Sequence, residues 1–218
     1  MKRMLIILIV VGALATAWSQ TGKPSGRLDE LARRARAEGR SEVQIGIGDI
    51  ETLDASSLTE ALSNFTVVLA QPITSISVRR GDSIVTWTKF NAIEFLALRP
   101  NCEACSFRQE PPETLLPFGS NQFVLPIPGG TVDVEGIKVR SSGKHTVLFE
   151  PGKTYLLLLN MNSIGQARLD AGVSGAFFVN DDGTIRPISK HNVRWAKELQ
   201  EHYPSVAAVR GATKPASK

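Results

Sequence analysis

The chain has 218 residues, with 25 Lys or Arg against 21 Asp or Glu, and therefore a formal net charge of +4 at pH 7. Two of the positive charges, Lys2 and Arg3, lie at the start of the chain, so the remainder is close to neutral. This balance excludes a basic nucleic-acid-binding protein, in spite of an isoelectric point near 9.2. The length is sufficient for one domain with a real hydrophobic core.

The first segment has the pattern of a secretory signal. Its two positive residues precede an almost purely apolar run over 4–14, and small residues then allow cleavage after Ala17 or after Ser19. The run is shorter than the roughly 20 residues that a spanning helix needs, which disfavours the alternative of an uncleaved membrane anchor. We therefore predict a signal peptide over 1–19 and an exported protein, periplasmic or extracellular, with no integral membrane span after signal removal.

A leader and a helix are expected over 20–40. The first part is polar and rich in turn residues, and the spacing of Leu28, Leu31, Ala32 and Ala35 predicts a helix over 27–38 that ends at Gly39. Alternating apolar residues predict a strand over 42–50. A capping box, Ser57 followed three residues later by Glu60, predicts a short helix over 57–63.

A long antiparallel hairpin is the strongest β prediction. Two runs rich in β-branched and aromatic residues, 65–80 and 83–98, flank the turn dipeptide Gly81-Asp82. Pro72 indicates a break, bulge or edge position in the first strand, because proline donates no backbone hydrogen bond.

A proline-rich, irregular excursion over 99–121 follows the hairpin. After it, apolar runs predict further strands at 122–127, 131–140, 145–150 and 153–161, and a hairpin over 175–188 with Asp182-Gly183 at its turn. The rest comprises a helix over 192–203, with Asn192 as its cap, and a polar, disordered tail over 211–218.

The order of these elements predicts a mainly β fold. We expect a β-barrel domain over 41–190, either an antiparallel closed barrel of the OB-like type or a sandwich, with short flanking N- and C-terminal helices. The C-terminal helix and the tail would occupy 191–218.

The only two cysteines, Cys102 and Cys105, lie in the irregular excursion. A structural disulfide is the simplest interpretation in an oxidising compartment. A redox pair normally sits at a helix N-terminus after a strand, which this proline-rich context does not resemble. A metal site needs about four ligands, and the three histidines show no ligand spacing. Disulfide exchange and metal binding remain the alternatives, and the sequence offers no other metal site.

One stretch resembles a known type of protein. The pattern Phe149-x-Pro151-Gly152-x-x-Tyr155-Leu-Leu, within a match over roughly 55–188, is similar to uncharacterised exported bacterial β-barrel proteins with an OB-like or netrin-type barrel. The resemblance implies that Phe149 packs into the core and that Pro151-Gly152 forms a turn that starts the strand at Tyr155. It implies no catalytic residue and no cofactor.

The sequence therefore predicts an exported, non-enzymatic binding or envelope-associated module, whose partner is a protein or an envelope component. A barrel face or the 99–121 loop would contact the partner. Two alternatives come from other classes. One is a thiol-disulfide exchange protein that uses Cys102 and Cys105, and the other is an inhibitor of an exported hydrolase, which only the fold analogy favours.

The intact mass of the natively exported protein tests the signal and the cysteines together. We expect a chain that begins at Trp18 or Gln20 and whose two cysteines react with a thiol label only after strong reduction, because a bridged pair has no thiolate. Labelling without reductant, or a mass that includes a metal, would make the Cys102–Cys105 segment the active region and favour the exchange enzyme.

Overall fold

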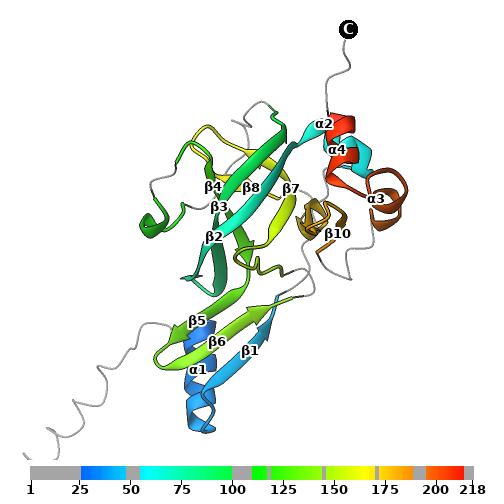
Figure 1. Ribbon diagram of the computed structural model, residues 1–218. Coiled ribbons are helices and arrows are strands. Elements are labelled where there is room, and N and C mark those ends of the chain that lie inside the picture. Colours follow the sequence, from blue (N-terminus) through cyan, green and yellow to red (C-terminus); the bar gives the residue numbers. More distant parts are fainter. Residues whose placement is uncertain are drawn as a thin grey trace, which may run out of the picture.

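The computed structural model describes a mainly β chain with two sheets and short helices (Figure 1). The predicted signal peptide and both cysteines lie outside the described residues. So do His145, His191 and the predicted cap Asn192. The described residues are 26–47, 55–99, 110–116, 119–143, 146–169, 172–188 and 195–213.

The larger sheet has the strand order β10-β9-β7-β2-β3-β4, with β8 paired to β7. All of its strand pairs are antiparallel. Its strands are β2 (Thr66–Arg80), β3 (Ser83–Ala97), β4 (Gln122–Pro128), β7 (Thr154–Met161), β8 (Ala167–Arg168), β9 (Ala176–Val179) and β10 (Ile185–Pro187).

The smaller sheet has the order β1-β6-β5 and forms a separate lobe beside the larger one (Figure 1). β5 (Gly130–Val134) and β6 (Ile137–Ser142) form an antiparallel hairpin, whereas β1 (Glu42–Gly46) pairs with β6 in parallel. Helix α1 (Arg27–Ala37) packs on this sheet. The predicted helix and its buried apolar side are therefore confirmed.

Three more helices gather at one end of the larger sheet. They are α2 (Leu58–Asn64), α3 (Ala196–His202) and α4 (Val206–Thr213). Ser57 caps α2 as predicted, because its hydroxyl accepts the amide proton of Glu60 at 3.0 Å. Short 3-10 turns occur at η1 (Glu113–Leu115) and η2 (Gly172–Gly175). None of these described helices is long and apolar enough to cross a membrane.

The predicted hairpin of β2 and β3 is confirmed, with Gly81-Asp82 as its two-residue loop. Gly81 has φ +60, which fits the first central position of a type II′ turn. The pairing contains three irregularities, each with one extra residue: Ile73 on β2, and Ile93 and Leu96 on β3. The first follows Pro72 directly, beyond the point where pairing of β2 with β7 ends.

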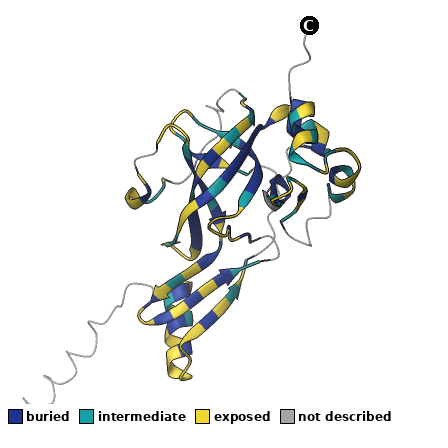
Figure 2. Ribbon diagram, in the orientation of Figure 1, coloured by how far each residue is buried: buried dark blue, intermediate teal, exposed yellow. Residues whose placement is uncertain are grey.

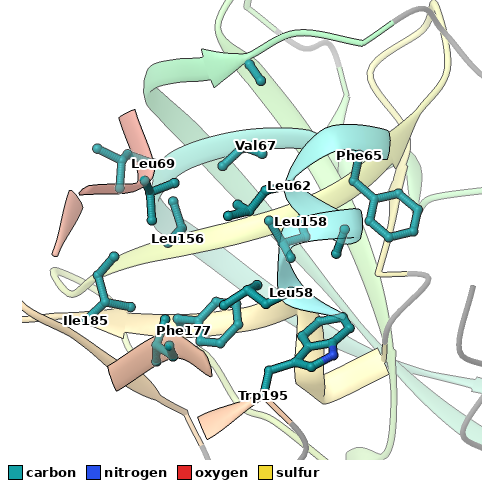
Figure 3. Close-up of a cluster of buried hydrophobic side chains, with 14 of the residues drawn as sticks. Leu58, Leu62, Phe65, Val67, Leu69, Leu156, Leu158, Phe177, Ile185 and Trp195 are labelled. Atoms are coloured by element: carbon teal, nitrogen blue, oxygen red, sulfur yellow. The ribbon is translucent and has the colours of Figure 1, made fainter. Parts of the chain in front are cut away.

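Two hydrophobic clusters occupy the two faces of the larger sheet. The first fills the space between the sheet and α2, α3 and α4, and Figure 3 shows Leu62, Val67, Leu158 and Trp195 within it. The second includes Phe90 and other residues of β2, β3, β4, β7, β8 and β9. Most of the buried residues lie on these strands (Figure 2).

The chain crosses from the larger sheet into the smaller one at Gly129-Gly130, between β4 and β5. There the backbone lies directly against the hairpin, and Thr86 donates a buried hydrogen bond of 2.7 Å to the Gly129 carbonyl. A Cβ atom on Gly130 would lie 2.1 Å from Thr86 Oγ1 and 2.4 Å from Ser77 Oγ. Only glycine permits this close approach.

The tip of the hairpin also holds α1. Asp29 receives two hydrogen bonds from the Arg79 guanidinium, one of them 2.8 Å long, and accepts the Gly26 amide that begins the helix. The Arg79 guanidinium is the main cause of the lowered pKa of Asp29. Beside this pair, Ile84 of β3 is buried among Leu28 and other apolar residues of the smaller lobe.

Several predicted elements are wrong in detail. The segment 131–140 is the β5–β6 hairpin rather than one strand, because Glu135 and Gly136 both adopt positive φ and form a turn. Residues 146–150 form no strand, although Val147 and Phe149 are buried, because they pack against the second cluster without a partner strand among the described residues. The predicted tail is helical up to Thr213, the end of α4, and the C-terminal helix begins only at Ala196.

The predicted closed barrel is not confirmed, since neither described sheet closes on itself. The parallel pairing of β1 is a second departure from the predicted antiparallel architecture.

We expect Gly130→Ala to destabilise the protein by about 2–4 kcal/mol, because the new methyl group collides with Thr86 and the residue keeps φ +127. Gly46→Ala is the matched control, because a Cβ on that strand glycine meets nothing within 4 Å and its φ is not in the left-handed region. Urea unfolding of both variants measures the difference. Equal stabilities would show that the crossing is not tightly packed.

Candidate functional site

The residues of the resemblance lie within the core and its adjoining turn. Phe149 is buried with its ring centroid 4.9 Å from Phe90 and 4.9 Å from Tyr155, in edge-to-face contacts. Pro151-Gly152 forms the turn before β7, and Gly152 has φ +78. The Tyr155 hydroxyl accepts the Glu150 amide at 3.0 Å, while burial raises the pKa of Tyr155. This arrangement stabilises the fold and presents no reactive group to solvent.

The remaining predicted candidates give no site within the described residues. Cys102 and Cys105 lie outside them, so their pairing stays a prediction. In the part of the chain that the structure describes, no three His, Cys, Asp or Glu residues lie close enough to hold a metal ion. Trp87 and Trp195 are both buried and so form no exposed aromatic surface.

A pocket of about 460 Å³ lies where β3 ends between α2 and α4. It is lined by Ser63, Leu96, Ala97, Leu98, Arg99, Ala212 and Thr213. The two hydroxyl groups are engaged locally, because Ser63 donates to the Thr59 carbonyl and Thr213 to the Val209 carbonyl. The pocket therefore combines short apolar walls with one guanidinium group.

Arg99 is held from two directions. Its backbone amide donates to Thr66 Oγ1 at 3.1 Å, and its Nη2 donates to the Leu62 carbonyl at 3.2 Å near the end of α2. Its Nε atom is buried and has no hydrogen-bond partner. A buried charged donor without an acceptor is costly. An acceptor close to Nε would therefore stabilise the cation, and no described residue supplies one.

The helices that wall the pocket are fixed by acidic side chains. Glu94 of β3 forms a two-pronged ion pair with Arg210 of α4, with contacts of 3.1 and 2.7 Å. Hydrogen bonding to Arg210 is the first cause of the lowered pKa of Glu94. From α3, the Glu198 carboxylate accepts the amides of Leu58 and Thr59, each at 2.8 Å, and so caps the first turn of α2.

Exposed apolar side chains lie near the end of β3, two of them on the strand and one, Leu98, in the pocket lining just after it. Ile93 is 52% exposed, Phe95 37% and Leu98 70%. Pairing with β4 ends at Asn91, and the Ala92 amide then donates to Asn121. Beyond that point, no described strand pairs with this edge of β3. We call Ile93, Phe95, Leu98 and Arg99, together with the pocket, the β3-end surface.

Sequence analysis missed this surface, although it placed a functional loop at 99–121. Arg99 is the first residue of that predicted loop and was given no role of its own, and α4 was not predicted at all. The available signal was the run 92–96, in which two apolar residues stand side by side at Ala92-Ile93 and again at Phe95-Leu96. That loss of alternation marks the two bulges on β3.

Comparison with known proteins adds no family: no family model, no curated protein and no solved structure matches the chain.

The cap on α2 gives a pH-dependent prediction. Burial acts to raise the pKa of Glu198, but the Thr59 hydroxyl and the amides of Leu58 and Thr59 outweigh it and hold the pKa below its ordinary 4.5. A depressed pKa contributes stability above about pH 4.5, and this contribution is lost as the pH falls through the folded value. We expect Glu198→Gln to lose about 1–2 kcal/mol at pH 7 and much less at pH 3.

Urea unfolding of the wild type and the variant at the two pH values measures this difference. Glu201→Gln is the control on the same helix, because the Glu201 side chain is half exposed and makes a long contact of 3.8 Å with Lys197. A loss for Glu198→Gln that does not change with pH would contradict the carboxylate cap.

Proposed function

We propose that this chain is an exported, non-enzymatic binding module that holds a partner protein of the cell envelope at the β3-end surface. The observation that carries the proposal is the coincidence, at one end of β3, of three features. These are exposed Ile93, Phe95 and Leu98, an unpaired strand edge among the described residues, and a pocket containing Arg99. An exposed edge next to apolar side chains is the kind of surface to which another chain adds a strand.

The chemistry of the pocket favours binding over catalysis. Among the described lining residues the only ionisable group is the Arg99 guanidinium, which has donors but no acceptor and so offers no general base. Its hydroxyl groups, on Ser63 and Thr213, donate to backbone carbonyls and have no adjacent base among the lining residues. The alternative of thiol-disulfide exchange depends on Cys102 and Cys105 and is tested by the mass measurement described above.

We further propose that β7, β2, β3, β4 and β8 form a partly open, OB-like barrel. Val124 of β4 forms an isolated bridge with Gln166, next to β8, and its amide donates to the Gly165 carbonyl at 3.0 Å. Since β8 pairs with β7, this contact brings together β8 and β4, the two ends of the proposed barrel order β8-β7-β2-β3-β4. The second hydrophobic cluster, which includes Phe90, Phe123 and Leu157, would then fill the barrel interior.

Export supports the choice of partner. The signal pattern over 1–19 predicts passage across a membrane, and the β3-end surface is then available to proteins of the envelope or outside the cell.

Site-specific photocrosslinking in the native host tests the proposal. We expect benzoylphenylalanine at position 98, and at position 93, to give the same ultraviolet-dependent adduct, whose crosslinked peptide maps to one site on one partner. Position 164 is the matched control, because Ile164 is 63% exposed and lies in the turn before β8. The same adduct from position 164, or none from positions 93 and 98 in a folded protein, would contradict the proposal.

A further inference from the structure

We propose that the partner inserts an apolar chain end into the pocket, with its terminal carboxylate paired to Arg99 and its preceding residues extended along the edge of β3. This inference rests on the proposed function and names the chemistry that the β3-end surface recognises. Three observations on the described residues carry it: Arg99 has no counter-charge among them, none of those that line the pocket is acidic, and the pocket lies where the described pairing of β3 with β4 has ended.

The first observation is the state of the guanidinium. Arg99 Nη2 has one weak acceptor, the Leu62 carbonyl at 3.2 Å, and Nε has none. Solvent does not reach Nε, and so water does not compensate for the missing acceptor. A carboxylate would first pair with the more exposed Nη edge of the guanidinium. A small rotation of the side chain would then let both Nε and one Nη donate in the two-pronged geometry that arginine favours.

The second observation is the composition of the pocket. None of the seven described residues that line it is acidic. The nearest carboxylate along β3, Glu94, is already engaged by both Nε and Nη2 of Arg210. The counter-charge for Arg99 is therefore absent from the described surroundings, and a ligand that supplies it gains a charge-assisted hydrogen bond in a half-buried site.

A carboxylate fits this site better than a phosphate group. The pocket offers one cation and no lysine, and the hydroxyl groups of Ser63 and Thr213 both donate to backbone carbonyls. Phosphate has three acceptor oxygens and more negative charge, and its sites provide several donors. One guanidinium fork matches one carboxylate.

The third observation is the position of the pocket. On its β4 side, β3 has no described partner strand beyond the hydrogen bond from Ala92 to Asn121, and this edge leads to Leu96–Arg99 at the pocket. The C-terminal end of an added strand would thus lie at Arg99, and its terminal carboxylate could pair with the guanidinium. The bulges at Ile93 and Leu96 interrupt the regular ladder, so the edge accepts only a short segment.

The size of the pocket agrees with this occupant. Its volume of about 460 Å³ lies in the lower part of the range of small-ligand sites, and its nonpolar wall includes Leu96, Leu98 and Ala212. The space therefore has room for one carboxylate together with the side chain of the same terminal residue.

The test uses acetyl-Ala-Val-Val-Leu with a free carboxylate and the same peptide with a C-terminal amide. Binding is followed by NMR of the 15N-labelled protein, and the Nε–H signal of Arg99 is assigned from its loss in Arg99→Lys. We expect the acid to shift that signal and the amides of Leu96 and Leu98, with saturation at roughly millimolar peptide. We expect the amide peptide to bind at least about tenfold more weakly.

Two variants establish the role of the guanidinium. Arg99→Met should abolish the preference for the acid, and Arg99→Lys should retain part of it, because lysine keeps the charge but loses the fork. Arg34→Met is the control, since Arg34 is an exposed arginine on α1 that pairs with Glu30. Thermal unfolding establishes that each variant is folded.

The outcomes separate this inference from the proposed function. Equal binding of acid and amide peptides, or no binding of either while position 98 still crosslinks, would overturn the terminal carboxylate and leave the binding module intact. Equal binding of acetyl-Ala-Val-Val-Glu-amide would show that any carboxylate suffices and would overturn recognition of the chain end. A shift of the Arg99 signal on deletion of residues 214–218 alone would assign the pocket to this chain's own end and overturn an external partner.

Discussion

The pairing of β2 with β3 is the constraint on which the rest of the structure depends. Two strands of 15 residues each are joined by a loop of only two residues, so their register is fixed by the turn. The first residues of β2 bind β7, the middle of β3 binds β4, and the tip of the hairpin enters the smaller lobe through Ile84. The other strands of the larger sheet and the smaller lobe are therefore positioned relative to the β2–β3 hairpin.

The irregularities of that ribbon create the candidate site. A regular strand exposes every second side chain, and a bulge shifts this alternation by one residue. The extra residues Ile93 and Leu96 produce two such shifts within a few positions, so Ile93 and Phe95 are exposed while Leu96 packs against the helical cluster. The same bulges turn the edge of β3 away from a flat geometry, which discourages indiscriminate pairing between copies of the chain. The exposure of Ile93 and Phe95 and the protection of the β3 edge against pairing between copies therefore have the same cause, the two bulges on β3.

Local signals in the sequence predicted the parts of the fold that local chemistry determines. Gly81-Asp82, the cap at Ser57 and the apolar side of α1 are of this kind, because each depends on residues a few positions apart. The prediction was poorer where distant segments decide the outcome. Residues 146–150 alternate like a strand but have no described partner strand, and the parallel pairing of β1 depends on β6. The pocket was missed for the same reason: Arg99 acquires its role only when α2 and α4, far apart in the chain, flank it.

The parallel pairing of β1 has a consequence for how the chain is made. Glu42 pairs with Lys138, so β1 leaves the ribosome, and any export channel, long before its partner exists. Antiparallel hairpins close as soon as their second strand appears, whereas this pairing must wait for the whole β2–β3 ribbon and β4. During that interval the apolar faces of α1 and β1 have no surface to cover them. The smaller lobe contains the earliest described residues, yet it stays incomplete until β6 has been made.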